Sequence, residues 1–234
     1  MTGVDDLRPG RTLSGYADVV EFVQREVSLG RLVPGQKLPA ERKLAEHLGV
    51  ARETLRQALR VLEGSGQVVI VRGTAGGAVI QDTGLAPHVA LHVLRQRRDD
   101  LLDLVEFRSE LESVAARMSA SRRASQHLDE MADAQDALHS AENKDQSRRA
   151  DTAFHLAVAR ASGNPPLAAA IEDARASMFH SVDLVDYEFI KESSHAQHQL
   201  VFESIVAGDG AAAAEHMRRH VELSRLEMLK MIDG

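Results

Sequence analysis

The chain has 234 residues, of which 44% are hydrophobic and only 3% aromatic; it has no cysteine, and its formal net charge is −7. This length allows one large domain or two ordinary ones, and the absence of cysteine excludes disulfides and thiolate metal sites. The sequence has no apolar run near 18 residues and no signal-peptide pattern, so we expect a cytoplasmic protein without a membrane partner.

The acidic charge is unevenly divided along the chain. Residues 1–80 hold 11 Lys and Arg against 9 Asp and Glu, whereas residues 81–234 hold 17 against 26. Within residues 30–73 the basic residues number 8 and the acidic residues 4. Because the basic excess is local, the acidity of the whole chain does not exclude nucleic acid as a partner.

The N-terminal third predicts three helices, the last two forming a helix-turn-helix. Apolar spacing over residues 15–29 indicates the first helix, and a glycine turn at residues 47–50 separates two further helical patterns. The last pattern has one apolar face, formed by Leu55, Ala58, Leu59 and Leu62. Its opposite face carries Arg52, Thr54, Arg56 and Arg60. A basic outer face on the second helix is typical of a helix that enters the DNA major groove.

Two β-branched runs follow, at residues 67–71 and 78–80, around a glycine-rich tip at residues 72–77. This pattern predicts a hairpin. Beside a helix-turn-helix it would form a wing, with Arg72 and Gly73 near a minor groove or a phosphate. Alternatively, the hairpin only covers the helices.

The rest of the chain has helical patterns throughout. After a short linker at residues 81–85 we expect seven helices, near 86–97, 99–120, 125–142, 145–162, 165–183, 190–207 and 211–232. Glycine, proline and asparagine at residues 163–166 and 208–210 mark the clearest breaks. The expected fold is therefore mainly α. It comprises a DNA-binding winged helix-turn-helix at residues 1–80 and an all-helical bundle at residues 86–234.

Residues 30–60 carry a longer and more specific motif. The run GRLVPGQKLPAERKLA is followed by LGVARETLRQALR. This cassette resembles the winged helix-turn-helix of the GntR family of bacterial regulators. The resemblance implies a homodimer that binds double-stranded DNA at a palindromic operator.

Side-chain chemistry suggests a role for each residue on the reading helix. Arg52 is the first candidate for a base-edge contact, because arginine to guanine is the commonest specific pair. Arg56 lies one turn further and would reach a base or a phosphate. Arg42 and Thr54 would hold phosphates and fix the register.

Two positions of the cassette depart from the family pattern. Ala51 stands where the family favours a hydroxyl residue, so a helix-capping or phosphate-binding oxygen is missing. Glu53 is unusual on a helix that faces DNA; it would either accept a hydrogen bond from cytosine or turn to solvent. Both residues belong to the expected DNA interface and put the exact operator in question.

The helical half carries a second informative set. Asp151 and His155 lie one helical turn apart and share a face, and His198 and His220 follow on two later helices. Three imidazoles and a carboxylate suit a borderline divalent metal such as Zn or Ni. By spacing alone, a solvated helix face or a helix-surface hydrogen bond is the more usual explanation of such a pair. By helical geometry, His195 or His216 could also replace its neighbour as a ligand.

The sequence around these residues resembles the FCD effector domain of the FadR-type branch of the GntR family. The resemblance rests on DTAFHL at residues 151–156, on HQLVFESIVAGD at residues 198–209 and on MRRH at residues 217–220. It selects Asp151, His155, His198 and His220 as ligands of a divalent metal, with Zn expected first and Ni or Mn as alternatives.

The same resemblance implies a small carboxylate effector held against the metal and an arginine. Arg108 matches the early ExRxxLE pattern of the domain and could hold a carboxylate through two hydrogen bonds, or pair with Glu112 one turn away. Asn164 would support this site or cap a helix. Both Arg108 and Asn164 are candidate effector-binding residues.

The sequence thus favours a non-enzymatic transcription regulator, by default a repressor, that a metal-bound carboxylate switches. Three alternatives stay open: a metal that only braces the bundle, a fatty-acyl effector, and a metal-dependent hydrolase. The hydrolase has the least support, because no HExxH or similar motif places a general base near the metal.

Overall fold

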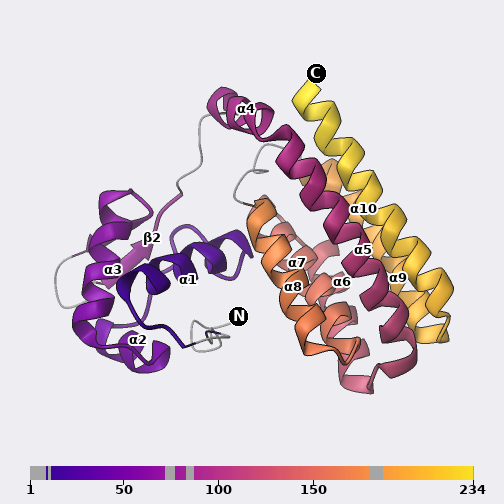
Figure 1. The fold of residues 1–234 in the computed structure, drawn as a ribbon, viewed down its shortest axis with the longest axis horizontal. Helices are drawn as coiled ribbons and strands as arrows, with labels where there is room; N and C mark the ends of the chain where they lie inside the picture. The colour runs from indigo at the N-terminus through magenta and orange to yellow at the C-terminus, as the bar shows by residue number, and fades with distance from the viewer. Residues whose placement is uncertain (1–8, 10–11, 72–76, 83–86, 180–186, 234) are drawn as a thin grey trace. The chain divides into compact units, whose positions relative to one another are not determined.

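The structure is a computed structural model that describes residues 9, 12–71, 77–82, 87–179 and 187–233. The chain divides into two compact units, residues 1–84 and 85–234 (Figure 1). Within the described ranges, no helix is both long and apolar enough to cross a membrane.

The N-terminal unit contains the three expected helices. They are α1 Tyr16–Ser28, α2 Glu41–Leu48 and α3 Arg52–Gly64. Gly49 ends α2 in the left-handed conformation, with φ of 68°, which glycine adopts without a steric penalty. The buried face of α3 consists of the four apolar residues that the spacing predicted, Leu55, Ala58, Leu59 and Leu62. The helix-turn-helix is confirmed.

A two-stranded antiparallel hairpin completes this unit. Strand β1 Val68–Val71 pairs with β2 Gly77–Ile80, in a register that places Val68 opposite Ile80 and Val71 opposite Gly77. Backbone hydrogen bonds also join β2 to the segment before α2, for example from the Leu38 N–H to the Ala78 carbonyl at 2.8 Å. The hairpin therefore packs onto the helices as a wing. Its tip, with Arg72 and Gly73, lies outside the described residues.

The C-terminal unit consists of seven helices in its described residues, as expected. They are α4 Pro87–Gln96, α5 Arg98–Arg122, α6 Ser125–His139, α7 Lys144–Ala161, α8 Pro165–Phe179, α9 Tyr187–Ala207 and α10 Gly210–Asp233. The mainly α fold, with a winged helix-turn-helix before a helical domain, is thereby confirmed.

Some helix boundaries differ from the prediction. Helix α6 ends at His139 instead of residue 142. The reason is Asn143, which is extended and caps α7: its side chain accepts a hydrogen bond from the Gln146 N–H at 3.0 Å. Helix α9 begins at Tyr187, three residues earlier than expected. The predicted end of α8 at residues 180–183 lies outside the described residues, as does most of the linker, residues 83–85.

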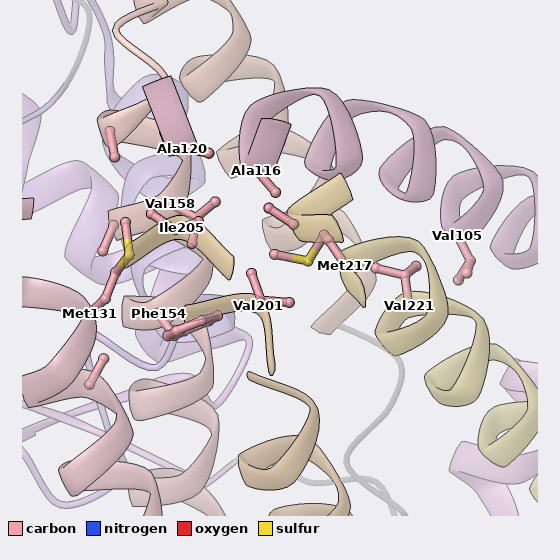
Figure 2. Packing of buried hydrophobic residues seen from close by; sticks show 14 of the residues in the cluster. Val105, Ala116, Ala120, Met131, Phe154, Val158, Val201, Ile205, Met217 and Val221 are labelled. Carbon is pink, nitrogen blue, oxygen red and sulfur yellow. The ribbon is translucent and has the colours of Figure 1, made fainter. Parts of the chain in front are cut away.

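The core of the helical unit brings together side chains from six helices, α4, α5, α6, α7, α9 and α10. Figure 2 shows Val105 of α5 near Val221 of α10, and Val201 of α9 near Phe154 of α7. Met131 of α6 is fully buried in the same cluster. In Figure 1 the long helices α5 and α10 run side by side. This packing fixes α7, α9 and α10 around a common centre.

The reading helix α3 lacks a side-chain cap, which makes its stability testable. Ala51 is its N-cap residue, is extended (φ −65°, ψ 146°) and makes no side-chain cap hydrogen bond. We expect Ala51→Ser to stabilise the N-terminal unit by about 0.5–2 kcal/mol, since serine accepts a hydrogen bond from the first turn. Urea denaturation and amide hydrogen exchange of α3 would measure the gain. Ala51→Val, which adds bulk without an acceptor oxygen, is the control; an equal gain there would contradict the capping explanation.

Candidate functional site

The four predicted metal ligands come together in the helical unit. Asp151 and His155 lie one turn apart on α7, His198 on α9 and His220 on α10. Each offers a ligand atom, and these four atoms all lie within 4.8 Å of one another. The three histidines are buried, and the Asp151 side chain is 19% exposed.

The three imidazoles converge through the same ring atom. Their Nε2 atoms are 3.1 Å apart between His155 and His220, 3.1 Å between His155 and His198, and 3.2 Å between His198 and His220. The Asp151 Oδ1 atom lies 3.5 Å from the Nε2 atom of His198. Two nitrogens bound to one ion at about 2.0–2.1 Å are themselves about 3.0–3.4 Å apart. The spacing therefore fits a single shared ion.

Packing holds the imidazoles in these orientations. The Phe154 ring stacks on the His198 ring, with centroids 4.1 Å apart and planes 10° apart. Phe154 is itself fully buried and precedes His155 on α7. The phenylalanine of the DTAFH motif thus positions a histidine from another helix, a role that the sequence analysis had not assigned.

Burial also sets the charge of these rings. It lowers the pKa of His155 and His198, and it lowers the pKa of His220 to about 3. Burial alone would raise the pKa of Asp151, but the positive charge of the Arg175 guanidinium outweighs it, and this pKa lies below its usual value. The donor set at neutral pH is therefore three neutral imidazoles and a carboxylate, which suits a divalent metal.

Two further residues contact the ligands, and neither role was predicted from the sequence. Glu112 of α5 contacts the Nδ1 atom of His155 through its Oε2 atom. Arg175 of α8 is fully buried and donates a hydrogen bond to Asp151 Oδ2, with another guanidinium nitrogen 3.6 Å from Glu112. The sequence did hold a signal for Arg175. An arginine among the alanines of an apolar helix is expected to be buried, and a buried charge needs a partner of opposite charge.

Arg108, a predicted effector ligand, is buried beside this cluster. Its Nε atom donates to Glu112 Oε1 at 2.9 Å, and its Nη1 atom contacts the Met178 sulfur at 2.7 Å. Burial lowers the pKa of Arg108, and the Glu112 carboxylate opposes that shift. The intrahelical pair, which the sequence offered as the alternative to effector binding, is therefore formed.

Asn164 lies at the start of α8. Its Oδ1 atom accepts a hydrogen bond from the Leu167 N–H at 3.3 Å, so the side chain caps this helix. The cap was the alternative role given to Asn164, and its effector role stays a prediction.

The two competing histidines point elsewhere. The His216 Nδ1 atom lies 3.0 Å from the Ser204 hydroxyl and 3.1 Å from the Leu200 carbonyl. The His195 ring lies 5.2 Å from that of His139. Neither belongs to the four-residue cluster found among the described residues.

The expected DNA-reading residues gather at the start of α3 and on α2. Arg52 and Glu53 are exposed in the first turn of α3, directly after the exposed Ala51. Arg42 on α2 is exposed and pairs loosely with Glu46, 3.4 Å away. Thr54 is partly buried.

Arg56 occupies a more crowded position than the sequence suggested. Its guanidinium lies 3.7 Å from Glu53 Oε2 and 3.9 Å from Glu41 Oε2, and its side chain is 43% exposed. Such exposed pairs contribute about 0–1 kcal/mol, so a phosphate can replace a carboxylate here at small cost. Glu53 thus faces Arg56 along the helix.

Two family models match the chain. The model described as bacterial regulatory proteins, gntR family, matches residues 15–77. The FCD domain model matches residues 103–223.

Curated relatives match over most of their length. A protein of Escherichia coli (strain K12) named "Putative L-lactate dehydrogenase operon regulatory protein" is 32% identical over 224 residues, covering 90% of this chain and 85% of its own. The Glc operon transcriptional activator of the same strain is 29% identical, covering 87% and 84%. LutR, an HTH-type transcriptional regulator of Bacillus subtilis (strain 168), is 28% identical, covering 82% and 91%.

A solved structure shares the fold. E. coli McbR/YncC superposes with a TM-score of 0.58 at 20% identity, covering 93% of this chain and 98% of that one. With its winged helix-turn-helix, its helical domain and these matches, the chain belongs to the GntR family of DNA-binding transcription regulators and carries an FCD domain.

Proposed function

We propose that this regulator binds a palindromic operator as a homodimer and that a small carboxylate, bound at a divalent metal, switches its affinity for DNA. The metal would be held by Asp151, His155, His198 and His220. The observation that carries the proposal is the convergence of three neutral Nε2 atoms within 3.2 Å of one another. A divalent ion bound there would act as a Lewis acid that attracts an anionic oxygen ligand.

The charge balance of the site supports an anionic effector. Two carboxylates, Asp151 and Glu112, face two guanidiniums, Arg108 and Arg175, and the histidines are neutral. A divalent ion would therefore add two positive charges to a balanced, largely buried site. Because an uncompensated buried charge is costly, binding of an anion would offset it. A small carboxylate fits this requirement better than an acyl chain does.

The relatives suggest a first compound to test. One of them is named for an L-lactate dehydrogenase operon, so L-lactate is a small carboxylate with a direct rationale. We propose repression in the absence of effector as the default. The Glc operon relative is named an activator, however, so the sign of regulation has to be measured.

A partly exposed apolar stripe on α5 supports the homodimer. Its members alternate three- and four-residue spacing, which is typical of helices that pack against another helix: Leu104, Phe107, Leu111, Val114 and Met118. Phe107 is 50% exposed, which is unusual for a large aromatic side chain. A second copy of the chain would cover this stripe.

We expect His198→Ala and Asp151→Ala to abolish metal binding, since each removes one donor of the cluster. Elemental analysis should find about one metal ion per chain in the unaltered protein and little in either variant. L-Lactate should raise the melting temperature and shift operator affinity only in the metal-loaded protein. Operator binding in the absence of effector should persist in both variants.

His216→Ala is the matched control, because it removes a histidine of α10 outside the cluster. Full metal content in both cluster variants would contradict the site. If the metal is present but no carboxylate shifts the melting temperature or operator affinity, the metal only braces the bundle.

On the reading helix, we expect Arg52→Ala to weaken specific binding by about 1–3 kcal/mol, because it removes a candidate base contact. Glu53→Gln should instead tighten binding by roughly two- to fivefold, since it removes a negative charge near phosphate and an ion pair of Arg56. Fluorescence anisotropy with operator and scrambled DNA at two salt concentrations would separate the two effects. Weaker binding by Glu53→Gln would show that Glu53 itself accepts a hydrogen bond from a base.

For the homodimer, we expect Phe107→Glu to weaken self-association by about tenfold or more, because a charge would replace a central aromatic contact. Light scattering after size-exclusion chromatography measures the mass. Leu226→Glu, which alters another exposed apolar residue on α10, is the control. If only Leu226→Glu dissociates the dimer, the interface is formed by α10 and not by α5.

A further inference from the structure

One contact beside the ligand cluster has a consequence for the chemistry of His155. The Glu112 Oε2 atom touches His155 Nδ1, the ring nitrogen that faces away from the cluster. Both side chains are almost completely buried, with exposed fractions of 1% and 2%. The other ring nitrogen, Nε2, is the one that lies 3.1 Å from the Nε2 atoms of His198 and His220.

The partners of Glu112 determine its charge state at this contact. Its Oε1 atom accepts a hydrogen bond from Arg108 Nε at 2.9 Å and lies 3.6 Å from Arg175 Nη1. A carboxyl group that faces two guanidiniums is ionised and can only accept hydrogen bonds. With Oε1 engaged by the arginines, Oε2 is the oxygen directed at His155.

The contact then fixes the tautomer of His155. Neither Glu112 Oε2 nor His155 Nδ1 makes a hydrogen bond of regular geometry in the structure. At contact distance the carboxylate oxygen would repel a lone pair on Nδ1 but attract an N–H there, and an ionised carboxylate has no proton of its own to supply. The proton must therefore be on Nδ1, which leaves the lone pair on Nε2. This is the form that a metal-ligating histidine requires, and the contact with Glu112 imposes it.

We propose that Glu112 is a positioning residue for the metal centre: it holds His155 as the Nδ1–H tautomer, with Nε2 aimed at the ion, and thereby sets metal affinity. The inference rests on the proposed function, in which His155 is a metal ligand. Arg108 contributes to this positioning, because it lies one turn before Glu112 on α5 and orients the Glu112 carboxylate.

A purely structural role for Glu112 is the competing explanation. In that case Glu112 would only neutralise the buried Arg108, and the state of the His155 ring would not depend on it. The two explanations differ in their consequences for the tautomer and for metal affinity, so both quantities are measured.

The first measurement needs no substitution. Long-range ¹H–¹⁵N NMR of the metal-free, full-length protein reports which ring nitrogen of each histidine carries the proton. We expect His155 to be protonated at Nδ1 and unprotonated at Nε2. The opposite tautomer, or an even mixture, would overturn the inference.

The second measurement compares metal affinities by competition between protein and a chromophoric chelator, with Zn and Co as probes. Glu112→Gln keeps the shape of the side chain but removes the charge that holds the proton on Nδ1. We expect the affinity to fall by about 10- to 100-fold, the usual effect of removing such a partner of a ligating histidine. The Co absorption spectrum should also change, which a loss of helix packing alone would not produce in a folded variant.

Glu130→Gln is the matched control. Glu130 likewise pairs with an arginine, Arg160, at 2.7 Å, but this pair lies on the surface of α6 and α7. The metal affinity of the Glu130→Gln variant should equal that of the unaltered protein. If Glu112→Gln binds metal as tightly as the control, Glu112 is not a positioning residue, and the metal site itself still stands. If the unaltered protein binds neither metal, the proposed function fails, whatever tautomer His155 adopts.

Discussion

The balance of four charges in the middle of the helical unit is the constraint on which the rest of this unit depends. Glu112 and Arg108 come from α5, Asp151 from α7 and Arg175 from α8, so their pairs tie three helices together. Removing one partner of such a buried pair leaves an uncompensated charge, at a cost of about 3–5 kcal/mol. Small alanines on α5 and α7, many of them fully buried, let these helices approach closely enough for the pairs to form.

Local patterns of the sequence predicted the elements that depend on local rules. The faces of α3, the end of α2 at Gly49 and the pairing of Asp151 with His155 all follow from spacing within one or two helical turns. Predicting that His198 and His220 join this pair required the resemblance to a known domain, because sequence spacing does not show which helices lie side by side. The end of α6 was wrong, since the capping preference of Asn143 outweighed a helical pattern that continued to residue 142.

The contacts that sequence reasoning missed join residues far apart in the chain. Glu112 meets His155 across 43 positions, and Arg175 meets Asp151 across 24. A lone buried arginine on α8 predicts a carboxylate partner but does not identify which carboxylate. Arg108 shows the opposite case: its partner Glu112 lies one turn away and was named from spacing, as an equal alternative to the effector role.

The two units use arginine in different ways. Arg56 is about half exposed and lies 3.7–3.9 Å from its carboxylates, so exchange of these partners for a DNA phosphate would cost about 1 kcal/mol or less. Arg175 is fully buried and donates a hydrogen bond to Asp151, so it supplies a positive charge beside this carboxylate. A divalent metal on Asp151 would supply that charge instead, and Arg175 could then serve an anion beside it. Under the proposed function, the metal would therefore bind before the effector, whereas DNA binding at α3 would need neither.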